Sequence, residues 1–156
     1  MSAHAATSAL TRRRLLQGTA ALALAHALPS VAATEVPDIP LLVELLAGRA
    51  PRWERLRLEL PALADNGQTV PLKLAMPGPF APGPTVQAIH LFSEKNPVPD
   101  MAVFEFPVPI EKIEIDSRVR LAGSQKVVAV AVMSDGALYA AAADVVVTIA
   151  ACLDGS

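Results

Sequence analysis

Hydrophobic and polar residues alternate along most of the chain after residue 50, a period that is typical of half-buried β-strands. The first example is Leu56, Leu58 and Leu60, which are separated by charged residues. Strands with a similar pattern are predicted at residues 70–74, 86–92, 101–106, 112–121, 126–133 and 137–149, the last as one long strand or two. About seven short strands separated by turn signals predict an all-β fold, an antiparallel β-sandwich.

One short helix is predicted at residues 39–48, before the strands begin. Asp38 is the expected cap, Pro40 fits the first turn and Gly48 is expected to end the helix. Pro71 interrupts one of the predicted strands. Because proline has no backbone N–H to donate, this strand is expected at a sheet edge or at a bulge.

The first 33 residues have the anatomy of an export signal. Residues 11–16 carry three arginines before two leucines, and an alanine-rich apolar run and small residues follow, with cleavage expected after Ala33. The paired arginines before Leu-Leu resemble a twin-arginine (Tat) signal, which implies a periplasmic protein, while an ordinary secretory signal is the alternative. The apolar run is shorter than the roughly 20 residues that cross a bilayer, so no membrane span is expected.

Composition limits the function further. The chain has 156 residues and 53% are hydrophobic, which suits one packed domain after the leader. Removing the leader takes three arginines and no acid, so the formal net charge changes from −2 to −5. A mildly acidic chain without basic runs is not expected to bind nucleic acid. The single cysteine excludes an intramolecular disulfide and every multi-cysteine metal site.

His90 is the only histidine after the leader, so any catalytic group that uses histidine would need it. It lies among apolar neighbours in a predicted strand, and no titratable group is predicted close to it. This favours an ordinary strand histidine over a general base. An exported β-sandwich enzyme that uses His90 stays as an alternative. The chain also has no glycine-rich phosphate loop, and no cofactor is expected.

Cys152 lies just after the last predicted strand, which ends in the β-branched run 145–149. Free cysteine is usually buried, so one interpretation is that Cys152 completes this strand and packs inside. The other is an accessible thiol that is used chemically, because an oxidising compartment offers little reason to keep a lone exposed thiol otherwise. The residues alone leave both interpretations open.

Several motifs occur in order along the chain, at residues 65–67 and 70–71, 89–97, 118–122, 125–131, 134–136 and 147–149 with Cys152. In order and spacing they resemble SoxY, the carrier subunit of the sulfur-oxidation (Sox) pathway. The resemblance covers residues 41–152 and implies an immunoglobulin-like sandwich that carries substrate rather than catalysing a reaction. It implies that Cys152 lies on a C-terminal swinging arm and holds sulfur intermediates of thiosulfate oxidation covalently. It also implies pairing with a SoxZ-like subunit, as a heterodimer or larger, and transient contact with a haem enzyme, a hydrolase and a dehydrogenase of the pathway.

The arm itself departs from the family pattern, which typically reads Gly-Gly-Cys-Gly-Gly. Alanines before the cysteine remove backbone freedom, Leu153 adds bulk, and Asp154 places a negative charge near the thiolate. These differences leave a second possibility, a divergent SoxY-like subunit that binds partners but carries sulfur poorly or carries another species. We therefore predict a leader at 1–33, a sandwich at 34–149 and an arm at 150–156. The arm residues beside Cys152 are Ala150, Ala151, Leu153, Asp154 and Gly155.

Overall fold

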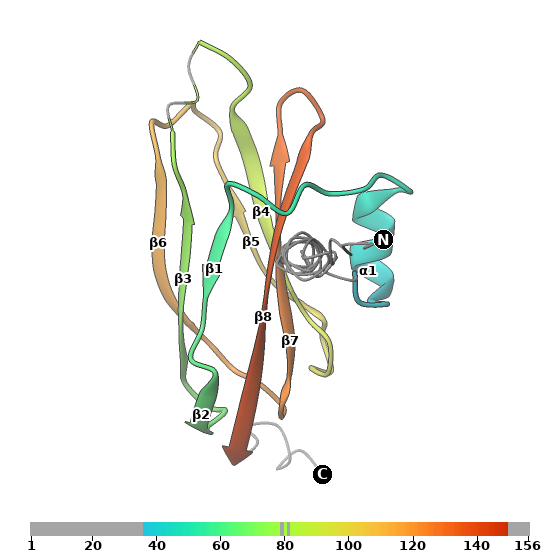
Figure 1. Ribbon diagram of the computed structural model, residues 1–156, viewed down its shortest axis with the longest axis vertical. Helices are drawn as coiled ribbons and strands as arrows, with labels where there is room; N and C mark the ends of the chain where they lie inside the picture. The colour runs from blue at the N-terminus through green and yellow to red at the C-terminus, as the bar shows by residue number, and fades with distance from the viewer. Residues whose placement is uncertain (1–35, 79, 81, 150–156) are drawn as a thin grey trace, which may run out of the picture. The chain divides into compact units, whose positions relative to one another are not determined.

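The structure is a computed structural model that describes residues 36–78, 80 and 82–149 (Figure 1). The predicted leader and the predicted arm, including Cys152, lie outside the described residues.

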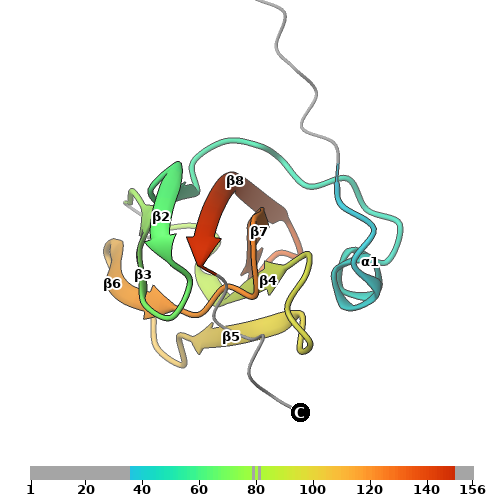
Figure 2. The same ribbon diagram turned by 90° about the horizontal axis from the view of Figure 1, so that it is seen from below.

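Two sheets pack face to face, and this arrangement confirms the predicted immunoglobulin-like β-sandwich (Figures 1 and 2). One sheet has three strands in the order β1-β3-β6, and the other has five in the order β2-β8-β7-β4-β5. All neighbouring strands are antiparallel except β2 and β8, which are parallel. The strands are β1 (Arg57–Glu59), β2 (Leu63–Asn66), β3 (Val70–Met76), β4 (Val86–Ser93), β5 (Asp100–Glu105), β6 (Ile113–Val119), β7 (Gln125–Met133) and β8 (Leu138–Ile149).

The main core lies between the two sheets and is built from the alternation visible in the sequence. In β3, every second residue from Val70 to Met76 is fully buried, while the residues between them face outward. Ile89 and Leu91 of β4 meet these side chains from the opposite sheet. Burial of a leucine or isoleucine side chain contributes roughly 1.5–3 kcal/mol, so this layer supplies much of the driving force for folding.

A smaller apolar cluster lies on the outer face of the five-stranded sheet, where helix α1 (Pro40–Leu46) covers it (Figure 2). Leu42 and Leu46 of the helix pack against a surface that includes Phe92 and Val130. Trp53, which follows the helix, packs against the same cluster. The helix therefore buries one part of a sheet face that would otherwise be exposed.

The predicted ends of the helix were wrong by one residue each. Ile39, not Asp38, is the N-cap, and no side chain caps the helix. Ile39 is only 2% exposed, so burial of this side chain sets where the helix begins. At the other end Ala47 adopts the left-handed conformation with φ of 47°, and its N–H donates to the carbonyl oxygens of Val43 and Glu44.

The prediction that Pro71 marks an edge or bulged strand was also wrong. β3 is the central strand of its sheet, and Pro71 pairs in register with Arg118 of β6. The strand on its other side, β1, pairs with β3 only from Lys73 to Ala75. Pro71 thus lies beyond the end of the short strand β1, and on that side β3 has no paired strand that would need an N–H from it.

At one end of the sandwich, Asn96 joins two loops through its side chain. Its Oδ1 accepts hydrogen bonds from the N–H of Ala122 at 2.9 Å and from Nε2 of Gln125 at 3.0 Å. Its Nδ2 donates to the carbonyl oxygen of Arg120 at 2.9 Å. Gln125 is only 5% exposed and also accepts from the N–H of Lys95 at 2.8 Å. The β4–β5 and β6–β7 connections are therefore held together by one amide network.

Replacing Asn96 with alanine is expected to lower the free energy of unfolding by about 1–3 kcal/mol, because the partly buried partners of its amide lose their hydrogen bonds. Urea unfolding measures this loss. The matched control is Asn66→Ala, since the Asn66 side chain accepts one exposed bond from the N–H of Gln68. Water replaces that bond, so the control is expected to lose less than about 1 kcal/mol. Equal losses in the two variants would contradict the proposed importance of the network.

Candidate functional site

The candidate site is the end of β8, from which the predicted arm begins. β8 is a single strand of 12 residues and not two. Its first part pairs with β7, and its last part pairs in parallel with the short strand β2, with Leu63 opposite Val146 and Asn66 opposite Ile149. Asp65 and Asn66 belong to β2, and a turn follows at Gly67, after which the chain enters β3 of the other sheet.

Hydrogen bonds hold β8 in place as far as its last residue. The carbonyl oxygen of Ile149 accepts from the N–H of Gly67 at 2.8 Å, and the Thr148 hydroxyl donates to the carbonyl oxygen of Asp65 at 2.6 Å. On the other side β7 begins only at Gln125, opposite Val145. Beyond Val145, where β7 no longer pairs with β8, the Ser124 hydroxyl accepts a hydrogen bond from the N–H of Val147 at 2.9 Å. The described end of β8 is therefore fixed in position, and it lies three residues before Cys152 in the sequence.

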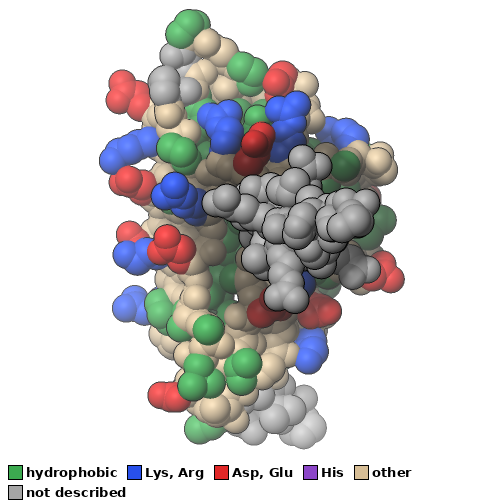
Figure 3. Space-filling model, in the orientation of Figure 1, with side chains coloured by type: hydrophobic (Ala, Val, Ile, Leu, Met, Phe, Trp, Pro, Cys, Tyr) green, Lys and Arg blue, Asp and Glu red, His purple; other side chains and the backbone are tan. Residues whose placement is uncertain are grey.

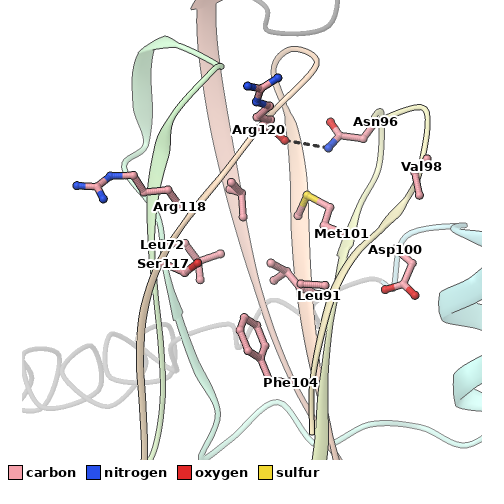
Figure 4. A pocket seen from close by; sticks show the side chains of 12 residues that line it. Leu72, Leu91, Asn96, Val98, Asp100, Met101, Phe104, Ser117, Arg118 and Arg120 are labelled. Atoms are coloured by element: carbon pink, nitrogen blue, oxygen red, sulfur yellow. Dashed lines mark hydrogen bonds between the residues drawn. The ribbon is translucent and has the colours of Figure 1, made fainter.

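A cavity of about 320 Å³ opens near this end, between the edge strands β5 and β6 (Figure 4). Leu91, Met101 and Phe104 lie in the space between the two strands, and the side chain of Arg118 points away from it. The lining is mostly apolar, with no pair of acid and base groups facing each other among the labelled side chains.

His90 lies on the outer face of the five-stranded sheet, away from the end of β8. Its ring stacks on Phe92 with centroids 6.0 Å apart and planes inclined by 7°. Val103 and Val130 are its neighbours on the adjacent strands. Among the described residues, no carboxylate or hydroxyl group forms a hydrogen bond with the His90 ring. This is the geometry of a strand histidine packed on an aromatic neighbour.

Two further findings concern the described part of the chain alone. No group of three or more His, Cys, Asp or Glu residues there is arranged to hold a metal ion. No helix within the same residues has the length and hydropathy needed to cross a membrane.

Comparison with known proteins identifies the family. The family model described as sulfur oxidation protein SoxY matches residues 43–152, which is more than half of the chain. The structure is similar to that of the sulfur carrier protein SoxY from Chlorobium limicola f thiosulfatophilum, with a TM-score of 0.56 and 30% sequence identity. That match covers 70% of this chain and 96% of that chain. The chain is thus an all-β sulfur oxidation (Sox) protein. Within that class, it belongs to the SoxY family.

Other comparisons add little. Superoxide reductase from Nanoarchaeum equitans is similar with a TM-score of 0.48 and 15% identity, covering 62% of this chain and 100% of that chain. Superoxide reductase (neelaredoxin) from Ignicoccus hospitalis is similar with a TM-score of 0.47 and 15% identity, covering 60% and 80%. These similarities are too low to support a comparison of function. No curated protein matches the sequence at a significant level.

The Ser124 bond is expected to control how firmly the last residues of β8 are held. Ser124→Ala should speed hydrogen exchange at the Val147 amide by roughly tenfold, because that N–H loses its side-chain acceptor. Exchange measured by NMR tests this. Ser134→Ala is the matched control, since the Ser134 hydroxyl accepts from the Thr85 N–H at 3.0 Å in a different turn. Unchanged exchange at Val147 in Ser124→Ala would show that backbone pairing alone holds this segment.

Proposed function

We propose that this protein is a periplasmic carrier that holds sulfur intermediates of thiosulfate oxidation covalently on the Cys152 thiol. Membership of the SoxY family and the similarity to the sulfur carrier protein from Chlorobium limicola support a carrier role. One observation supports Cys152 as the attachment point. The end of β8 is fixed by hydrogen bonds, and it lies three residues before the only cysteine of the chain. The leader, with its paired arginines, supports export to the periplasm.

The chemistry of carriage needs only a thiol on this chain. Joining the Cys152 thiol to the sulfane sulfur of thiosulfate forms one S–S bond and releases one proton and two electrons. A haem enzyme of the pathway accepts the two electrons. Hydrolysis of the terminal sulfur–sulfur bond then releases sulfate and leaves a persulfide on Cys152, which a dehydrogenase oxidises further. A disulfide-type linkage suits a carrier because attack by another nucleophile breaks it again.

In this proposal the protein is the substrate of partner enzymes and is not itself an enzyme. It needs no resident cofactor, since the sulfur group is its cargo. The alanines, Leu153 and Asp154 of the arm support a second candidate, a divergent subunit that binds partners but carries sulfur poorly. The two candidates differ in one measurable property, the presence of a sulfur adduct on Cys152.

Intact mass should show that adduct. When the protein is incubated with thiosulfate and the haem enzyme of the pathway, we expect a mass increase that a reductant removes. Cys152→Ser should abolish it, because the hydroxyl cannot form the S–S bond, and His90→Gln should leave it unchanged. A wild-type protein that gains no mass under these conditions contradicts carriage. Turnover of a sulfur substrate that needs His90 and survives loss of Cys152 would instead favour an enzyme.

Pairing with a SoxZ-like subunit is the second part of the proposal. The edge strands β5 and β6 have six and seven residues, and each leaves one row of backbone groups without a strand neighbour among the described residues. Free edges of this length favour association with another chain.

The isolated chain is therefore expected to self-associate, and co-expression with the SoxZ-like subunit should give a complex of equal stoichiometry. Size-exclusion chromatography with light scattering measures both. An isolated chain that remains monomeric and does not bind the SoxZ-like subunit would contradict this pairing.

A further inference from the structure

We infer that the exposed apolar residues around the base of the arm form the surface on which the sulfur-processing enzymes dock. These residues, Leu63, Val146 and Ile149, are called the collar below. The inference rests on the proposed function, because it assumes that other proteins act on Cys152. It adds the surface that those proteins recognise and the chemistry of that surface.

The collar is unusually apolar for a surface. Leu63 is 58% exposed, Val146 is 55% exposed and Ile149 is 64% exposed, and they are three of the eight exposed large hydrophobic residues in the described part of the chain. Leu63 and Val146 are paired across β2 and β8 on the outer face of the sheet, whereas Ile149, the last residue of β8, is three positions further on and lies on the opposite face, so the collar flanks the end of β8 on both sides. Hydrophobic side chains gather at the lower end of the molecule in Figure 3, where Figure 1 places β2 and the tip of β8. Clustered exposed apolar residues mark interaction surfaces more often than scattered ones.

The short distance in the sequence between β8 and Cys152 determines how closely an enzyme must approach the collar. Cys152 is three residues beyond Ile149, and three residues span at most about 10–11 Å even when fully extended. Any enzyme that brings its reacting atoms to the thiol must therefore approach the end of β8 to within about that distance. Val146 lies roughly 10 Å back along the strand from Ile149.

An interface of ordinary size then buries the whole collar. Each partner in a specific complex contributes about 800 Å², which corresponds to a patch about 16 Å in radius. A patch of that size centred on the exit of the arm includes Leu63 and Val146. The centre of such an interface is depleted in charge, which matches the collar. The expected occupant is the apolar rim of an enzyme's active-site entrance.

A charged residue in the collar should slow enzymatic loading of Cys152 without changing the thiol itself. The test uses the full chain, as its complex with the SoxZ-like subunit, with thiosulfate and the haem enzyme. Leu63→Glu is expected to lower kcat/KM for loading by about tenfold, the usual effect of a lost contact at an interface centre. Alkylation of Cys152 by iodoacetamide should proceed at the wild-type rate.

Val108→Glu is the matched control. Val108 is 64% exposed and lies in the connection from β5 to β6. This connection is at the far end of the sandwich from Gly67 and from the end of β8. This variant should load like the wild type. Val146→Thr is the second collar variant, because it keeps the β-branched shape that suits a strand and removes only apolar surface. It keeps the test decisive if Leu63→Glu does not fold.

Each result has one meaning. Slower loading of the collar variants, with normal alkylation and a normal control, supports the inference. Equal loading of the collar variants and the wild type overturns it. So does loss of the SoxZ-like subunit from Leu63→Glu, because the collar would then be covered by that subunit. Failure of the wild type to load overturns the proposed function instead, and the two failures are thus distinguishable.

Discussion

The parallel pairing of β2 with β8 is the constraint on which the candidate functional end of this protein depends. β7 begins at Gln125, opposite Val145, so the last residues of β8 have no ladder on that side. β2 pairs with the opposite side of β8 over only four residues, and the side chain of Ser124 supplies an acceptor on the β7 side. Exposed strand ends fray when their backbone groups lack partners. Because this end does not lack them, the arm starts from a defined place.

The sequence predicts most of the sandwich because alternation reports which face of a strand is buried. The strands at residues 86–93 and 125–133 agree with their patterns to within a residue, and so does the long last strand. Features that depend on pairing are harder to predict. Pro71 lies in a central strand, at a position that the short strand β1 does not reach, and no local pattern in the sequence reveals the length of a neighbour 12 or more residues away. Asp38 is a good cap by residue type, yet burial of Ile39 determines where the helix begins.

The same distinction applies to the candidate site. Cys152 stands out in the sequence because it is the only cysteine and follows a β-branched run. The residues that hold the end of β8 do not stand out, since Asp65 and Thr148 are 83 positions apart in the chain. Ser124 is an ordinary turn residue until β8 is placed beside it. Their roles arise from the register between distant segments, which composition and periodicity do not encode.

The position of β8 between β2 and β7 has a mechanical consequence. Under the proposed function, an enzyme that drew Cys152 into its active site would pull on β8 along the strand axis. Hydrogen bonds between strands run nearly perpendicular to that axis, so the pull loads them in shear and not one after another. β7 on one side and β2 on the other share the tension, and it spreads through the five-stranded sheet. A pulling force applied at the end of β8 is thus resisted by the whole sheet, and the strands do not separate one after another.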